Sequence, residues 1–156
     1  MSDTIAKNVA DRLRQQIGQG AGSVSVDGDG VTVNVDVEQC ERYASGVRGI
    51  QVTPAQPGGD VRGVAERIVE GVTAIGDPLA IVECEPRAGQ AIVRSAEPET
   101  DEGGVTYWEA DVRQDGTSLH RYRKDHSQPE REVITEPLPH GAVGKIAEQL
   151  ADAVKQ

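Results

Sequence analysis

Three stretches of the chain place apolar residues at the spacing of an amphipathic helix, near its start, its middle and its end. They are residues 3–17, 61–75 and 140–155. In the first stretch, Ile5 and Val9 begin a series that repeats every four residues, so its apolar side chains fall on one side of a helix. The pattern predicts N-terminal, middle and C-terminal helices, each with one apolar side to bury.

Between the first two predicted helices, apolar and polar residues alternate with a period of two. The alternation runs through six valines, Val24, Val26, Val31, Val33, Val35 and Val37. Such a pattern predicts strands with one buried side. A tight turn at Gly28 and Asp29 would fold them into a hairpin that pairs Val26 with Val31. A third strand is expected at residues 47–52.

Four further strands are predicted between the middle and last helices. Two of them lie within residues 78–97 and are joined around Pro86–Gly89. The other two form a hairpin in residues 105–124, with a turn at Asp115 and Gly116. Because hairpins dominate this order, we predict a single α+β domain that spans the chain. Its sheet is largely antiparallel, and its helices lie on one face or at one end.

Composition and charge narrow the possible partners. Apolar residues make up 37% of the 156-residue chain and Phe is absent, so the core has to be built from Val, Ile, Leu and Ala. That core is modest for the length, and a homodimer interface would add burial. The net charge of −10 repels phosphate backbones and anionic membranes, which disfavours nucleic acid and membrane surfaces as partners.

The first 18 residues, the lack of a long apolar stretch and the cysteines favour a cytoplasmic location. Residues 1–18 are charged rather than apolar, so they do not resemble a secretory signal peptide. No stretch approaches the roughly 20 apolar residues of a membrane span. Cys40 and Cys84 lie far apart in the chain, and each has acidic neighbours that disfavour a reactive thiolate. We therefore expect a cytoplasmic protein with reduced thiols.

Motifs for nucleotides and metals are incomplete. The glycines of residues 18–23 follow a helix and precede a strand, which reverses the order of a dinucleotide site. Residues 25–36 match part of a calcium loop, but their flanks are predicted strands and Asp-Gly turn chemistry explains the same residues. Residues 140–145 lack the spacing of a P-loop, and no His or Cys pair has zinc spacing. We expect no metal and no cofactor.

Chemically reactive side chains are concentrated in residues 105–126, which hold the only Trp, two of the three Tyr and two of the three His. With a turn at Asp115 and Gly116, Asp111 faces His120, as it would if a carboxylate oriented a general base. The other candidate ligand-binding residues are Tyr107, Glu109, Arg121, Tyr122 and Arg123. Opposed polar pairs on a sheet account for the same residues without any ligand.

The order of elements resembles that of class I type III secretion chaperones. Residues 9–39, VADRLRQQIGQGAGSVSVDGDGVTVNVDVEQ, have the helix-then-hairpin character of that family, and GKIAEQLADAV, residues 144–154, resembles its closing helix. The resemblance covers most of the chain in element order and includes no specific motif. It implies a small acidic α+β protein that binds a partner protein. The hairpin at residues 105–124 is additional to the family's pattern.

Two functions remain open. The sequence favours a non-enzymatic, acidic protein-interaction module that binds a partner protein or a second copy of itself. Its expected interface lies on the apolar sides of the middle and last helices, at Val64, Ile68, Val72, Ile146 and Leu150. The alternative is a small-molecule-binding protein or an enzyme that uses the polar face of the 105–124 hairpin. A concave pocket lined by those side chains would distinguish it.

Overall fold

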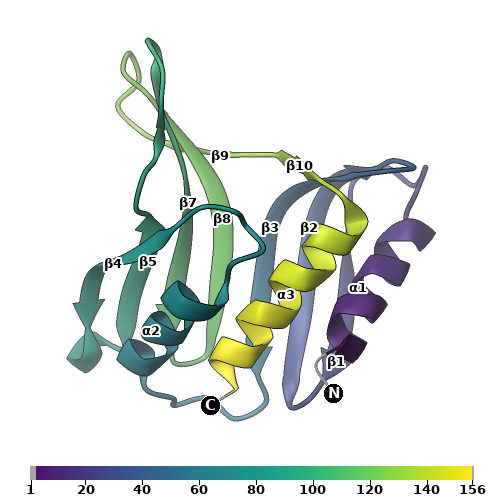
Figure 1. The fold of residues 1–156 in the computed structure, drawn as a ribbon, viewed down its shortest axis with the longest axis horizontal. Helices are drawn as coiled ribbons and strands as arrows, with labels where there is room; N and C mark the ends of the chain where they lie inside the picture. The colour runs from purple at the N-terminus through teal and green to yellow at the C-terminus, as the bar shows by residue number, and fades with distance from the viewer. Residues whose placement is uncertain (1–2, 156) are drawn as a thin grey trace.

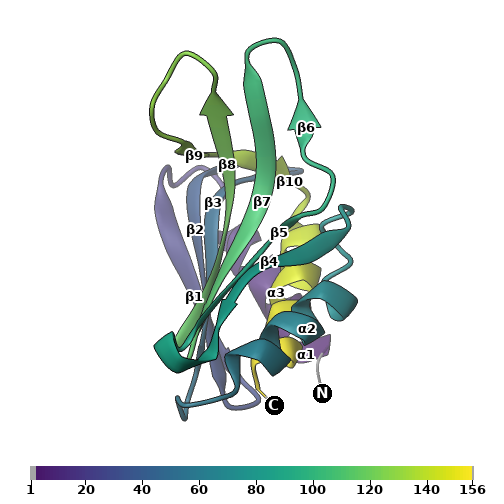
Figure 2. The same cartoon turned by 90° about the vertical axis from the view of Figure 1, so that its left-hand side faces the viewer.

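The computed structural model describes residues 3–155 and confirms an α+β fold with N-terminal, middle and C-terminal helices. The helices are α1 (Asp3–Gln15), α2 (Val61–Gly71) and α3 (His140–Val154), with a short 3₁₀ helix η1 (Pro86–Ala88). The strands are β1 (Gly22–Gly28), β2 (Val31–Cys40), β3 (Ser45–Pro54), β4 (Leu79–Glu85), β5 (Gln90–Ser95), β6 (Glu99–Thr100), β7 (Gly104–Arg113), β8 (Gly116–Asp125), β9 (Glu132–Ile134) and β10 (Glu136–Leu138). All three α-helices cover one face of the sheet, and none of them lies on its other face, which is called the open face below (Figures 1 and 2).

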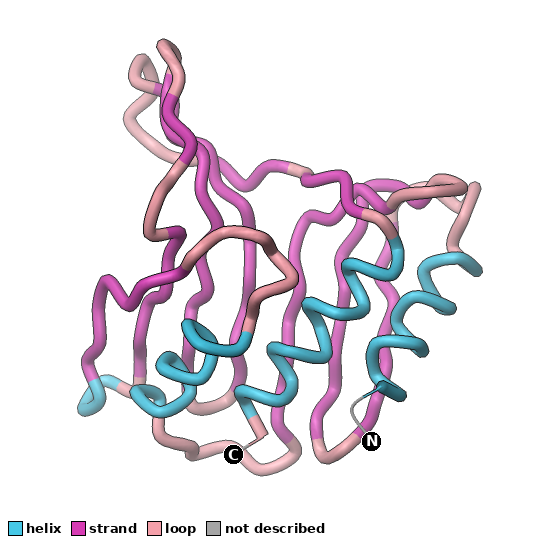
Figure 3. Tube along the Cα trace, in the orientation of Figure 1, coloured by secondary structure: helices cyan, strands magenta, loops and turns pink. Residues whose placement is uncertain are grey.

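All of the described strands join one antiparallel sheet in the order β1-β2-β3-β8-β7-β5-β4. The third strand predicted at residues 47–52 forms as β3 and is longer than expected. β3 and β8 pair only over residues 50–52 and 117–119, and beyond these residues the two strands diverge. There β9 pairs with β8 and β10 pairs with β3, so the chain before α3 bridges the two strands (Figure 3). Short β6 pairs with β7 where the β7–β8 hairpin projects from the body of the sheet (Figure 2).

The alternating valines and the amphipathic helices build the core as their spacing predicts. All six valines of β1 and β2 are buried on the helix-covered face, and so are Ile5, Val9 and Leu13 of α1. α1 and α3 pack closely because Gly144 of α3 faces the carbonyl oxygen of Ala6, where a Cβ atom would clash. Val-rich strands supply β-branched side chains that pack well on a half-buried sheet.

The middle helix is shorter than predicted. It begins at Val61 as predicted, and the Asp60 side chain caps it by accepting a hydrogen bond from the Arg62 backbone N–H. It ends at Gly71 instead of residue 75, and the next residues are held by α3. The Gln149 side chain accepts a hydrogen bond from the Ala74 N–H, at 2.9 Å, and its amide nitrogen also donates to the neighbouring threonine. A tertiary contact thus replaces the last predicted turn.

Both predicted hairpin turns are wrong by one residue. In the first hairpin the turn residues are Asp29 and Gly30, whose φ values of 54° and 79° suit the type I′ turn that joins two strands tightly. The pairing therefore moves by two residues, and Val26 faces Val33 rather than Val31. A shift of two residues keeps every side chain on its predicted face, which is why the alternation could not detect it.

Candidate functional site

The β7–β8 hairpin divides the predicted site residues between the two faces of the sheet. Those on the open face alternate with the core residues of the two strands, and they are Tyr107, Glu109 and Asp111 of β7 and His120 and Tyr122 of β8. Arg121 lies on the helix-covered face, where it pairs across the strands with Trp108. Arg123 follows on the same side of β8 in the projecting part of the hairpin. The structure therefore places five of the candidates on one face of the sheet and the two arginines on the other.

The predicted facing of Asp111 and His120 is wrong, because the turn residues are Gln114 and Asp115. Asp111 lies opposite Ser118, and His120 lies opposite Glu109. Gly116 takes part in pairing instead of turning the chain. A Cβ atom on it would come within 3.1 Å of the carbonyl oxygen of Val52 on β3, so this position requires the close approach that glycine allows. Asp111 accepts hydrogen bonds from two other side chains, those of Gln90 and Arg113.

Glu109 is the centre of the open face over β5, β7 and β8. Although it lies on the face without helices, only 4% of it is exposed. Arg94 donates two hydrogen bonds to one carboxylate oxygen, at 2.9 and 2.8 Å. Arg131 donates one at 2.8 Å to each oxygen. Burial raises the pKa of Glu109, but the hydrogen bonds from Arg131 and Arg94 outweigh it, so the pKa lies below its ordinary value.

Two tyrosine rings complete this cluster. The Arg131 guanidinium lies 3.8 Å from the ring centre of Tyr122, and the Arg94 guanidinium lies 5.0 Å from that of Tyr107. The two ring centres are 6.0 Å apart. Arginine and tyrosine side chains thus cover the Glu109 carboxylate, and both of its oxygens are occupied. A carboxylate held in this way is poorly placed to accept a proton from a substrate.

Sequence reasoning missed Arg94 and Arg131 as members of this cluster. Arg94 could have been predicted from the sequence, because it occupies a polar position in the alternation of β5 and lies directly opposite Glu109 in the sheet. Arg131 lies in the loop that follows β8, and it reaches Glu109 only because that loop folds back over the open face. No local pattern marks such a return of the chain.

Of the five open-face candidates, His120 lines a cavity between β2, β3 and β8. The cavity measures about 220 Å³ and is lined by Ser23, Asn34, Asp36, Gly49, Ile50, Gln51 and His120. The imidazole lies over Gly49, where a Cβ atom would come within 2.7 Å of Nε2. Burial lowers the pKa of His120 below its ordinary value, against the opposing charges of Asp36 and Glu109. The other four open-face candidates do not contribute to this cavity.

Arg121 is buried on the opposite face. Its side chain is 8% exposed, and its guanidinium lies 5.3 Å from the ring centre of Trp108. Three carboxylates surround it, Glu136 at 3.1 Å, Glu99 at 3.4 Å and Asp77 at 3.9 Å. Burial raises the pKa of Glu136, which the charge of Arg121 opposes. Because the Trp108 ring and the three carboxylates surround the Arg121 guanidinium, it is not available to bind a ligand.

Arg123 is held by the projecting part of the β7–β8 hairpin. It forms ion pairs with Asp101, at 3.0 Å, and with Asp125, at 2.6 Å, and it donates to the Thr106 hydroxyl. Hydrogen bonds from Arg123 and from the backbone of Gly103 keep the pKa of Asp101 well below its usual range. These contacts fasten the loop after β6 to β8, which gives Arg123 a structural explanation.

The five helix residues predicted to bind a partner are buried within this chain. Val64, Ile68 and Val72 pack towards the sheet from α2 and the residue after it, and Ile146 and Leu150 do so from α3. The apolar sides were identified correctly, but the sheet of the same chain covers them. They do not form a surface that a second protein could contact without lifting the helices.

A buried polar network that sequence reasoning did not identify joins α3 to the β2–β3 hairpin. Ser45 Oγ lies 2.8 Å from Nδ1 of His140 and 3.5 Å from Sγ of Cys40. His140 Nε2 lies 2.8 Å from the Glu41 carbonyl oxygen, which can only accept, so Nε2 carries a proton and donates to it. Although serine and histidine meet at hydrogen-bond distance, all three side chains are buried, so a substrate could not reach them.

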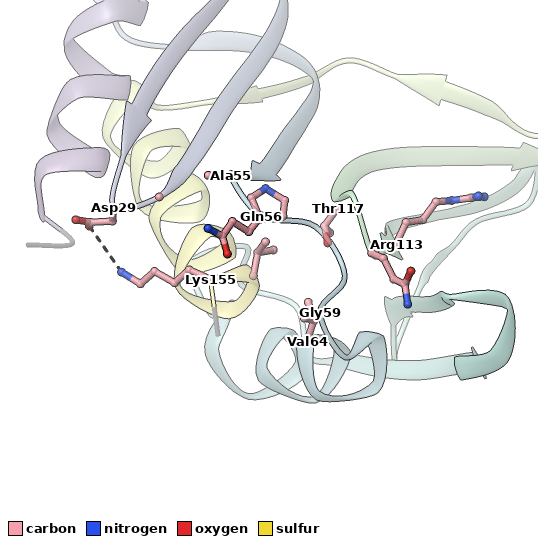
Figure 4. Close-up of a pocket in the computed structure, with 12 residues that line it drawn as sticks. Asp29, Ala55, Gln56, Gly59, Val64, Arg113, Thr117 and Lys155 are labelled. Carbon is pink, nitrogen blue, oxygen red and sulfur yellow. Dashed lines mark ion pairs between the residues drawn. The ribbon is translucent and has the colours of Figure 1, made fainter.

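A larger cavity of about 370 Å³ lies at the turn end of the sheet, beside the start of α2 and the end of α3 (Figure 4). It is lined by Asp29, Gly30, Pro54, Ala55, Gln56, Gly59, Val64, Arg113, Gln114, Thr117, Val154 and Lys155. Lys155 forms an ion pair with Asp29 at 3.7 Å across its edge. Figure 4 shows the Thr117 side chain pointing towards Gly59 and Val64 on the opposite wall. No sequence motif pointed to this cavity.

Comparison with known proteins gives no relative. No family model, no curated protein and no solved structure matches the chain. Within residues 3–155, none of the helices has the length and apolar character needed to cross a membrane. In the same described part of the chain, no three His, Cys, Asp or Glu side chains are grouped so that they could hold a metal ion.

Proposed function

We propose that the protein is a non-enzymatic interaction module that binds an extended segment of a partner protein as an added strand beside β1. The observation that carries the proposal is the outer edge of β1. This strand is the first of the sheet order and pairs only with β2 among the described residues. An edge strand offers a row of backbone donors and acceptors that another chain can use.

The hairpin geometry identifies which backbone groups face outward. Gly28 and Val31 close the two-residue turn, so they are a hydrogen-bonded pair, and such pairs alternate along an antiparallel hairpin. The N–H and C=O groups of Ser23, Ser25 and Asp27 therefore point away from β2. One of these groups has a partner, since Arg12 of α1 donates to the Ser25 carbonyl oxygen at 3.0 Å.

The opposite edge of the sheet, β4, is less suited to strand addition. Its pairing with β5 is interrupted at Val82, which bulges out of register, and Pro78 and Pro86 flank the strand. Bulges, prolines and charges are the usual means by which proteins prevent edge pairing. β1, in contrast, pairs with β2 in unbroken register over all seven of its residues. Its regularity makes it the better template.

Charge and alternation specify the partner. Side chains of an added strand would alternate between a position beside buried Val24 and Val26 and a position beside exposed Asp27. The net charge of −10 attracts cations to the whole molecule. We therefore specify an extended segment in which apolar residues alternate with Lys or Arg.

Two other observations favour binding over catalysis. The Glu109 carboxylate and the Asp111 carboxylate are occupied by neighbouring side chains of the sheet. The open-face candidates do not share one pocket, which the enzyme hypothesis requires. The resemblance of the element order to secretion chaperones, which bind partner proteins, agrees with this choice and does not identify the partner.

The test uses a short blocked peptide of alternating Lys and Val, with an alternating Glu and Val peptide as its charge control. Fluorescence anisotropy is expected to show binding of the basic peptide to the wild type. Ser25→Pro should weaken it about tenfold or more, since it removes an outward N–H and leaves the bonds to β2 in place. Ser25→Ala, which keeps the N–H, should bind like the wild type. Arg12→Ala should bind more tightly, because it frees the Ser25 carbonyl.

Two results would overturn the proposal. Equal affinity of the Ser25→Pro and Ser25→Ala proteins, both folded by circular dichroism, would show that the edge of β1 is not the binding surface. A wild-type dimer in light scattering that Ser25→Pro converts to a monomer would show that β1 takes up a second copy of this chain instead of a basic segment.

A further inference from the structure

We infer that the cavity at the turn end of the sheet is a binding site for a small uncharged molecule with a hydrogen-bonding head and an aliphatic body. The cavity is formed by the β1–β2 turn, the chain after β3, the β7–β8 turn and the ends of α2 and α3 (Figure 4). Its volume of about 370 Å³ falls in the range of small-molecule sites and exceeds by far the space of one water molecule. This inference is independent of strand addition at β1.

Thr117 supplies the observation that points to a ligand. It lies on the helix-covered side of β8, between Val52 of β3 and Val112 of β7, and is only 1% exposed. Its hydroxyl Oγ1 has no hydrogen-bond partner within the described structure. Buried hydroxyl groups are nearly always paired, because an unpaired one lowers folding stability. A polar group of a bound molecule would pair it.

The charged groups at the cavity are already neutralised, so the ligand does not need a charge. Lys155 pairs with Asp29 and, at 3.3 Å, with Asp152. Arg113 pairs with Asp111, and its guanidinium points away from Thr117 (Figure 4). The first turn of α2 is also unsuited to an anion, because the Asp60 carboxylate caps it beside Gly59.

The remaining lining matches a neutral amphipathic molecule. Val64 and Val154 provide aliphatic surface on the side of the two helices. The side-chain amides of Gln56 and Gln114 each offer a donor and an acceptor at the rim. A small amide or alcohol could place its polar head at the Thr117 hydroxyl and its carbon chain against the valines. A carboxylate of the same shape would lose its hydration without gaining a free cation.

The experiment compares isobutyramide with isobutyrate, which has the same shape and a negative charge. Both are titrated into the ¹⁵N-labelled protein and followed by NMR. Isobutyramide should produce saturable shifts at the backbone amides of Ala55, Gln56 and Thr117, and isobutyrate should bind about tenfold more weakly or not at all. Thr117→Val, which keeps the side-chain shape and removes the hydroxyl, should weaken isobutyramide about tenfold.

Thr106→Val is the matched control, since it removes a buried hydroxyl that is already paired with Arg123; Thr106 lies opposite Glu99 of β6 and is not part of the cavity lining. It should leave isobutyramide binding unchanged. Absence of saturable shifts in the wild type would overturn the inference and leave the cavity to ordered water. Equal binding by the Thr117→Val protein would overturn the role of the hydroxyl. Equal binding of isobutyrate would overturn the neutral ligand class.

Discussion

The β7–β8 hairpin buries one ionised side chain on each face of the sheet, and the two are surrounded in different ways. On the open face, Glu109 accepts hydrogen bonds no longer than 2.9 Å from Arg94 and Arg131. On the helix-covered face, Arg121 stacks on Trp108. Its nearest carboxylates, at 3.1 to 3.9 Å, are those of Glu136, Glu99 and Asp77. One centre is tightly bonded, and the other is loosely surrounded.

This difference shows that Glu109 orients the side chains around it, whereas Arg121 does not. The side chains of the two arginines beside Glu109 are about one third exposed, yet both point inward to the same buried carboxylate. The contact of Arg131 also holds the loop after β8 against the open face. Arg121 does not hold its partners in the same way, because water also solvates the Glu99 and Asp77 side chains, which are 77% and 37% exposed. Loss of Glu109 would therefore leave two cations without their common partner, whereas loss of Arg121 would leave acids that water can stabilise.

The largest expected effect comes from reversing the charge at Glu109. Glu109→Lys would place three cations together on the open face, with the new one buried. We expect a loss of about 3–5 kcal/mol in the free energy of unfolding, measured by urea denaturation. Glu85→Lys, an exposed position on β4, is the control for the change in net charge and should change stability by about 0.5 kcal/mol or less. Similar losses in both proteins would contradict a special role for Glu109.

The pH dependence of stability should separate Glu109 from Glu136. The folded pKa of Glu109 is lowered, so its contribution is present above the unfolded pKa of about 4.3 and is lost as pH falls through the folded value. Glu109→Gln should therefore cost about 1.5–3 kcal/mol at neutral pH and progressively less as pH falls below about 4. The folded pKa of Glu136 is raised, so its favourable contribution is present below the unfolded pKa and is lost as pH rises.

Glu136→Gln should accordingly show the opposite trend. The variant should gain stability relative to the wild type as pH rises from 4 to 7, because it cannot ionise in its buried position. Urea denaturation of both variants at a series of pH values measures the two differences. Parallel curves for Glu109→Gln and Glu136→Gln would show that the two carboxylates are not differently placed, and the comparison of the two faces would fail.

The sequence predicted which side chains of β7 and β8 lie on the same face of the sheet, but it did not predict which residues of the two strands lie opposite each other. Alternation in β7 and β8 assigns Tyr107 and His120 to one side and Arg121 to the other, as observed. It is blind to a shift of two residues, so the turn decides the pairing. In the structure the turn lies at Gln114 and Asp115, and Gly116 lies close to Val52 of β3, a strand far away in the chain. For that reason the pairing of side chains within the candidate site could not be read from the hairpin alone.

Long-range contacts also explain the rest of what the sequence left open. The apolar sides of α2 and α3 were predicted from their spacing, but spacing does not say whether the chain's own sheet or another protein covers Ile68 and Ile146. Arg131 meets Glu109 across a returning loop, and the cavity of Thr117 lies where five separate segments meet. Contacts and cavities of this kind are formed by segments far apart in the chain, so no local sequence pattern predicts them.

Removing the buried cation tests the other half of the comparison. Arg121→Met keeps an aliphatic chain over Trp108 and removes the charge. We expect a loss of about 1–2 kcal/mol at neutral pH, less than for Glu109→Lys, because the surrounding acids reach water or, for Glu136, take up a proton. Urea denaturation measures it, and NMR should show the pKa of Glu136 rising further. A loss as large as that of Glu109→Lys would mean that Arg121 is the more tightly determined centre.

The smallest expected effect is at His120, which lies beside Glu109 but does not join its hydrogen-bonded cluster. Its folded pKa is lowered by burial, so it favours the folded state above the unfolded pKa of about 6.5 and disfavours it as pH falls through the folded value. His120→Ala should cost about 1 kcal/mol or less at pH 8, and this cost should shrink or reverse at pH 5. Urea denaturation at the two pH values checks this. A cost that grows towards pH 5 would mean that the imidazolium is bound by Asp36 or Glu109, and the open face would then hold a second ionic centre.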